Sequence, residues 1–152
     1  MTEKVKDVYS FLIPMLEDSL LIPNTTVAEI VPFMNVSLFK DIEQTTDWHI
    51  GNVIWRNINI PVISLERVQG KQHLGEIRRS RIAIVYTLNS NHDMPYLALT
   101  VRGIPRLVPV DENNSKVLEA SPQEKGVKAW VDVDGRKALI PDLDLLEQMA
   151  SS

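Results

Sequence analysis

The side chains that could bind a metal ion or transfer a proton are scattered along this sequence. The histidines are far apart, at His49, His73 and His92, and no pair of them has the spacing of a metal site. The carboxylate pairs fall in expected turns or helix caps, where capping and solvated roles are commoner than acid–base catalysis: Glu17/Asp18, Asp111/Glu112 and Asp142/Asp144. Motifs for a serine nucleophile, a phosphate-binding loop or a dinucleotide site are absent. We therefore predict no catalytic set, no metal and no cofactor.

One stretch, Asp132-Val133-Asp134-Gly135, resembles the opening of a calcium-binding loop. If Asp132 held the first position, the required glycine would fall on Lys137 and the bidentate glutamate on Leu143. The motif fails. An Asp-Gly pair between two apolar runs instead predicts a tight hairpin turn.

Arg56 is the residue best placed to be functional. It stands with Asn57 between two β-rich runs, 50–55 and 58–63, and asparagine is one of the few non-glycine residues that tolerate a positive φ. We expect a tight turn with the arginine at its edge. Its aliphatic part could cover the rim of a β-barrel, or its five donors could face a partner's carboxylate or carbonyl groups. Pro61 cannot donate to a ladder, so the second strand should lie at an edge or be bulged.

A basic cluster lies between residues 67 and 81 and contains Arg67, Lys71, Arg78, Arg79 and Arg81. One interpretation is an electropositive patch for an acidic protein or a nucleic acid. The other is a solvated loop, which the lack of interleaved aromatic residues favours.

The composition is that of a globular protein with a core of its own. The chain has 152 residues, a formal net charge of -4, 44% hydrophobic residues and no cysteine. An acidic balance argues against nucleic acid as the main partner. The polar N-terminus is unlike a signal peptide, and no apolar run has the roughly 20 residues of a membrane span. We therefore expect a single cytoplasmic domain without direct membrane insertion.

The pattern of short apolar runs predicts a mainly β fold. Strands are expected at 8–15, 19–23, 27–31, 50–55, 58–63, 82–86, 96–101, 104–110, 129–133 and 138–140. Residues 33–47 should form a long connection and 68–81 a polar loop, and Asp142 can cap a short C-terminal helix over 143–149. The two halves are weakly similar at an offset of about 78 residues. Two small antiparallel barrels that share a core would satisfy this pattern and remove exposed strand edges.

Four of these segments, taken together, resemble the CheW-like domain family. They are Val27-Ala28-Glu29-Ile30, the stretch from Gly51 to Leu65 (GNVIWRNINIPVISL), Tyr96 to Val101 (YLALTV) and Gly135 to Leu143 (GRKALIPDL). They follow the order and spacing of the family's V-x-E-I, G-x-x-x-x-R-G-x-x-x-P-V-I-D-L, V-D-x-V and final G-x-x-x-x-L-L-D-x-x-x-L segments. The resemblance spans nearly the whole chain.

The resemblance implies two intertwined SH3-like five-stranded barrels with a shared core and a short C-terminal helix. We expect one domain over 1–152, with the first barrel at 19–78, the second at 79–135, and the terminal elements 1–18 and 136–152 completing them. It also implies a non-catalytic adaptor that couples methyl-accepting chemoreceptors to a CheA-type histidine kinase, at the periphery of receptor arrays. The implied partner-binding residues are Val27, Glu29, Arg56 and Asn57. No kinase contact can be aligned.

Three positions depart from the family pattern. Asn57 replaces the turn glycine, Ser64 replaces the aspartate of P-V-I-D-L, and Arg102 stands in place of the V-D aspartate. The chain is similar to the divergent ChpC- or PilI-like members, which act in twitching motility and type IV pili. Two other functions stay open: a small β-barrel that binds another acidic protein or nucleic acid through the 67–81 loop, and an enzyme with an unrecognised site.

Overall fold

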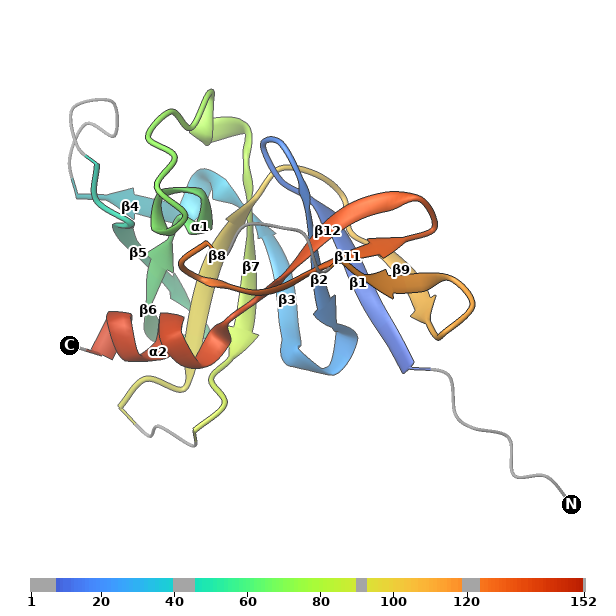
Figure 1. The fold of residues 1–152 in the computed structure, drawn as a ribbon. Helices are drawn as coiled ribbons and strands as arrows, with labels where there is room; N and C mark the ends of the chain where they lie inside the picture. The colour runs from blue at the N-terminus through green and yellow to red at the C-terminus, as the bar shows by residue number, and fades with distance from the viewer. Residues whose placement is uncertain (1–7, 40–45, 90–92, 119–123, 152) are drawn as a thin grey trace, which may run out of the picture.

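Two curled six-stranded sheets form the structure, a computed structural model that describes residues 8–39, 46–89, 93–118 and 124–151 (Figure 1). Sheet A has the order β10-β11-β12-β2-β1-β9, and its strands are β1 (Val8–Pro14), β2 (Ser19–Pro23), β9 (Arg106–Val110), β10 (Ser115–Val117), β11 (Val127–Val133) and β12 (Arg136–Pro141). Sheet B has the order β3-β7-β8-β6-β5-β4, and its strands are β3 (Val27–Pro32), β4 (Val36–Leu38), β5 (His49–Trp55), β6 (Ile58–Ile63), β7 (Arg81–Tyr86) and β8 (Tyr96–Val101). The predicted mainly β fold is confirmed.

The two sheets are related by an internal repeat in which the halves exchange their first hairpins. The hairpin β1–β2 begins the chain but pairs with β9 and β12, whereas β7–β8 begins the second half and pairs with β3 and β6. Each exchanged hairpin joins its sheet through an antiparallel ladder on one side and a short parallel ladder on the other, the latter between β2 and β12 or between β8 and β6. The exchange explains why each sheet contains strands from both ends of the sequence.

This exchange corrects the predicted barrel boundaries. The first barrel was expected at 19–78 and the second at 79–135, but β2 lies in sheet A, and β7 and β8 lie in sheet B with the strands of the first half. A pattern of apolar runs identifies strands without identifying their partners. Each sheet also gains a three-residue strand, β4 or β10, which the sequence analysis did not predict because three residues are too few for a periodic signal.

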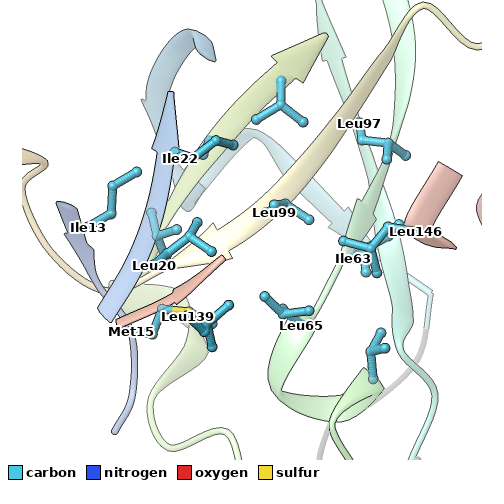
Figure 2. Packing of buried hydrophobic residues seen from close by; sticks show 14 of the residues in the cluster. Ile13, Met15, Leu20, Ile22, Ile63, Leu65, Leu97, Leu99, Leu139 and Leu146 are labelled. Carbon is cyan, nitrogen blue, oxygen red and sulfur yellow. The ribbon is translucent and has the colours of Figure 1, made fainter. Parts of the chain in front are cut away.

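The sheets pack against each other through one shared core of buried side chains, part of which Figure 2 shows. It takes side chains from both sheets and from both helices: Ile13, Met15, Leu20, Ile22, Ile63, Leu65, Val68, Ala83, Val85, Leu97, Leu99, Val101, Trp130, Leu139 and Leu146. Each sheet also encloses a smaller core of its own, around Val53 and Ile60 in sheet B and around Leu21 and Val133 in sheet A. Because the central strands are buried on both faces, their sequences are nearly continuous runs of apolar residues.

The two α-helices occupy equivalent places in the repeat. α1 (Leu65–Val68) follows β6, and α2 (Leu143–Ser151) follows β12 and begins 78 residues later. Short 3-10 helices complete the fold: η1 (Asn24–Thr26), η2 (Phe33–Asn35) and η4 (Ile77–Arg79). The predicted C-terminal helix is confirmed, and Leu146 packs in the shared core with Leu143 and Met149 beside it.

Both α-helices begin with a side-chain cap at the same repeat position. Ser64 Oγ accepts a hydrogen bond from Arg67 N at 3.3 Å, and Asp142 Oδ1 accepts one from Leu145 N at 3.1 Å. Serine and aspartate are about equally good at this position because either supplies an oxygen to an N–H group that has no partner within the helix. Ser64, although it departs from the family's aspartate, therefore caps α1 as Asp142 caps α2.

Removing either cap should lower stability by a similar amount. We expect Ser64→Ala and Asp142→Ala each to reduce the free energy of unfolding by about 1 kcal/mol, since each leaves one helical N–H without its acceptor. Asp142→Ser should keep most of the wild-type stability. Urea denaturation followed by circular dichroism would measure all three, and a full loss in Asp142→Ser would contradict the capping role.

The position of Pro61 differs in part from the expectation. β6 lies between β5 and β8, so it is not an edge strand. Its ladder with β8 covers only Val62 and Ile63, and Pro61 pairs with Asn52 of β5 alone. A proline is tolerated there because the missing N–H falls outside the parallel ladder. The bulge in this hairpin lies between His49 and Gly51 instead.

Candidate functional site

The predicted turn between β5 and β6 is present and has an uncommon backbone. Trp55 pairs with Ile58, and the two residues between them both have positive φ, 49° at Arg56 and 63° at Asn57. Positive φ at both central positions is the requirement of a type I′ turn, which suits the twist of a hairpin. Asparagine adopts this conformation at little cost, but an arginine does not, so the turn holds Arg56 in a strained conformation.

Trp55 brings two of the predicted site residues together. Its indole Nε1 donates a hydrogen bond of 2.8 Å to Glu29 Oε2, and the guanidinium carbon of Arg56 lies 4.3 Å from the centroid of its ring. Glu29 is on β3 and Trp55 on β5, which are far apart in the sheet order, so the contact exists only because sheet B curls. Both charged residues are exposed, whereas Trp55 is 8% exposed.

A tyrosine of β8 packs against Trp55, and a second tyrosine, on β7, packs against the first. The ring of Tyr96 meets Trp55 edge-on at 5.0 Å between centroids, and Tyr86 lies 5.4 Å from Tyr96. Tyr86 is 46% exposed, and Ile54, on the other face of β5, is 70% exposed. An exposed tyrosine next to the rings that pack on Trp55 is a feature common at protein-binding surfaces.

The other two predicted residues are placed differently. Val27 is half-buried and packs against the shared core, next to a bulge that separates it from Glu29 in the pairing with β7. Asn57 is exposed and forms the turn. Trp55 was not among the predicted site residues, although its place directly before Arg56 was a usable signal.

The basic 67–81 cluster does not form one patch. Arg67 is only 8% exposed and donates to the carbonyl oxygens of Asp47 and Gln72. Burial lowers the pKa of Arg67, and the charge of Asp47 opposes that shift. Arg79 pairs with Glu76, and Lys71 pairs with acidic residues of the β1–β2 turn. Three of the five charges therefore face protein groups, which weakens the case for a nucleic-acid surface.

Lys71 joins the segment after α1 to the β1–β2 turn through ion pairs. Its Nζ lies 3.0 Å from Glu17 Oε2 and 3.4 Å from Asp18 Oδ2. Burial alone lowers the pKa of Lys71, but the hydrogen bonds and charges of Glu17 and Asp18 outweigh it and leave the pKa above its ordinary value. A raised lysine pKa contributes stability below the unfolded-state pKa, and that contribution is lost as pH rises through the folded-state pKa.

Neutralising Lys71 should therefore have a small, salt-dependent effect. We expect Lys71→Gln to reduce the free energy of unfolding by less than about 1 kcal/mol at low salt and neutral pH, because the pair is partly solvated. The difference from wild type should shrink in high salt and at strongly alkaline pH. Urea denaturation under these conditions tests it, with Lys71→Arg as the charge-preserving control; a loss independent of salt would contradict the ionic origin.

Arg102, the third position that departs from the family pattern, stabilises the fold through hydrogen bonds to backbone carbonyl groups. Its guanidinium donates to the carbonyl oxygens of Leu74 and Glu76 and so fastens the segment before η4 to the end of β8. Burial lowers the pKa of Arg102, and the charge of the buried Glu66 opposes that shift. An aspartate could not make these contacts, since it has no donors.

The described residues hold no cluster of three histidine or acidic side chains that could bind a metal ion, and His92 lies outside them. Asp134 and Gly135 form a hairpin turn with φ of 52° and 82°, as predicted, and not a calcium loop.

A hollow with a volume of about 180 Å³ lies between the ends of β2 and β12 and the start of α2. Pockets that bind small molecules usually have volumes of roughly 300 Å³ or more, so this hollow is small for such a site. No helix within the described ranges is long and apolar enough to span a membrane.

Comparisons with known proteins agree with this fold. The CheW-like domain model matches residues 10–150. Among solved structures, the scaffolding protein CheW from Thermoanaerobacter tengcongensis is similar, with 24% identity, a TM-score of 0.68 and 90% of each chain covered. No curated protein matches. The two curled, strand-exchanged sheets are thus the two SH3-like barrels of that fold, and the chain belongs to the CheW-like domain family.

Proposed function

We propose that this protein is a non-catalytic adaptor that couples chemoreceptor signalling tips to a CheA-type histidine kinase. Family membership supports a role in chemotaxis signalling through protein–protein contacts. The sequence offers no catalytic set. We place the adaptor in the cytoplasm, at the receptor array, and assign it to a twitching or type IV pilus pathway on its similarity to ChpC- and PilI-like members.

The observation that carries the proposal is the convergence of Glu29 and Arg56 on Trp55. Two exposed charges of opposite sign are held at one rigid, aromatic-backed position on sheet B. Arginine and tryptophan are among the residues that contribute most to binding at interfaces. We assign this surface to receptor binding and leave the kinase to another part of the molecule.

The strained turn supports a binding role for Arg56. An arginine in the left-handed region costs on the order of 1–2 kcal/mol, which glycine or asparagine would avoid. Strain of this kind persists where function needs the side chain. Asn57, which makes the turn possible, belongs to the same surface, whereas half-buried Val27 supports β3 from the side of the shared core.

A pull-down from native cytosol and membranes tests the proposal. The wild-type protein should recover a chemoreceptor and a histidine kinase, identified by mass spectrometry. Arg56→Ala should recover the kinase and lose the receptor, because the kinase contacts lie elsewhere. Recovery of neither partner by the wild type would overturn the coupling function while leaving the family assignment intact.

A further inference from the structure

The indole of Trp55 contacts both charged side chains of the proposed receptor surface, Glu29 and Arg56. The N–H edge of Trp55 donates 2.8 Å to Glu29 Oε2, and its ring face holds the guanidinium of Arg56 at 4.3 Å. A hydrogen bond to a carboxylate is stronger than one between neutral groups, and a cation over an indole face is the most favourable cation–π geometry. The tryptophan thus binds an anion and a cation at two different parts of the same ring system.

This arrangement keeps Glu29 and Arg56 from neutralising each other. Among the residues with described positions, no ion pair joins them. Glu29 keeps its second carboxylate oxygen for other donors, and stacking leaves the guanidinium N–H groups at the periphery of its plane. The surface therefore presents one acceptor and one donor group that are each anchored but still able to bind.

The backbone and the packing make the indole a fixed point. Neighbouring side chains of an extended strand point to opposite faces, so Arg56 can reach the ring of Trp55 only because its φ is 49°. Trp55 is 8% exposed, and its ring meets that of Tyr96 edge-on at 5.0 Å between centroids. Burial and the aromatic contact restrict Trp55 to one orientation, and that orientation sets the spacing of the two charges.

We infer that Trp55 is a positioning residue for the partner-binding pair Glu29 and Arg56. The inference rests on the proposed function and specifies the chemistry of the receptor segment that fits: a hydrogen-bond donor facing Glu29 and a carboxylate or carbonyl oxygen facing Arg56. Pre-ordering both side chains reduces the entropy lost on binding. Without the indole N–H, the Glu29 side chain would be free before binding and would lose conformational entropy when the receptor fixes it.

The first test needs no partner. In the free, full-length protein, the indole N–H of Trp55 should exchange with solvent slowly in NMR spectra, because its hydrogen bond protects it. Glu29→Ala should speed that exchange by about tenfold or more, the factor expected from losing a hydrogen bond to a charged group. An unchanged exchange rate would overturn the inference, whatever the pull-down finds.

The second test is a double-mutant cycle, with the purified signalling hairpin of the receptor recovered in the pull-down as the probe. Trp55→Phe keeps an aromatic ring at this position and removes the N–H group together with the rest of the five-membered ring, a loss of volume for which Trp130→Phe is the control. Trp55→Phe should weaken binding in calorimetric titration by about 2- to 12-fold, the factor that corresponds to ordering one side chain. In a Glu29→Ala background, the same change should have no further effect. An equal loss in both backgrounds, or no loss in either, would overturn the positioning role.

Trp130 supplies the matched control. It is also buried, at 5% exposure, and also has a cation over its ring, Lys137 Nζ at 4.2 Å, but its Nε1 has no hydrogen-bond partner among the described residues. Trp130→Phe makes the same chemical change on sheet A and should leave receptor affinity unchanged. An equal loss of affinity in Trp130→Phe would assign the effect to the fold. Failure to recover any receptor would defeat the proposed function, and the exchange experiment would still decide the role of Trp55.

Discussion

Arg56→Ala should weaken receptor binding by about 2–5 kcal/mol, roughly 30- to 4,000-fold in Kd, without unfolding the protein. The guanidinium is exposed, stacked on a buried indole and held by a strained turn, so it is already ordered before the partner arrives. Truncation removes its donors and leaves a receptor carboxylate or carbonyl group without a partner. Calorimetric titration of the recovered receptor hairpin into each variant would measure the loss.

Two further variants separate the side chain from the turn. Arg56→Asn should lose as much affinity as Arg56→Ala while tolerating the positive φ, so its stability should equal or exceed that of the wild type. Arg56→Lys should lose an intermediate amount, because an ammonium keeps the charge and lacks the planar fork of donors. Arg78→Ala, which removes an exposed arginine of η4, is the surface control. Unchanged affinity in Arg56→Ala would refute the assigned role.

Gly51→Ala should be the most destabilising conservative change near the site. A Cβ added at Gly51 would lie 2.2 Å from the carbonyl oxygen of Ser37 on β4, inside the distance of any real contact. Because the obstructing atom is backbone, β4 would have to move away from β5. We expect a loss of about 3 kcal/mol in the free energy of unfolding, the upper part of the range for overpacking. Denaturation in urea would measure this loss.

Gly135→Ala is the matched control for Gly51→Ala. In the part of the chain that the structure describes, no atom outside the adjacent residues lies within 4 Å of a Cβ built at Gly135, but its φ is 82°. Alanine there should cost about 1 kcal/mol from backbone strain alone. Similar losses in the two variants would contradict the steric account of Gly51. The glycine at the start of the G-x-x-x-x-R segment is thus required by the close approach of β4.

Much of the local structure was predictable because it depends on neighbours in the chain. The two tight turns followed from Asn57 and from Asp134-Gly135, which are among the few residues suited to positive φ. The C-terminal helix followed from a cap at Asp142 and apolar residues on one face. The short strands β4 and β10 escaped prediction because their stability comes from the neighbouring strands β5 and β11 rather than from a pattern of their own.

The candidate site was predictable only as separate residues. Glu29 and Arg56 were named from the family resemblance, but nothing in the sequence placed them on the same indole. That contact joins strands 26 residues apart and depends on the curvature of sheet B. The basic cluster failed as a predicted patch for a related reason, since charge in the sequence does not reveal that Arg67 is buried.

The sequence by itself determined the class of fold, the turns, the helix caps and the family, because these depend on residue types at short spacing. The tertiary structure alone decided which strands pair, since apolar strands of similar length can exchange partners between two similar halves. It also decided that Trp55 would hold an acid and an arginine apart. Both outcomes depend on long-range packing, in which the curvature of a sheet brings together side chains that the chain itself keeps distant.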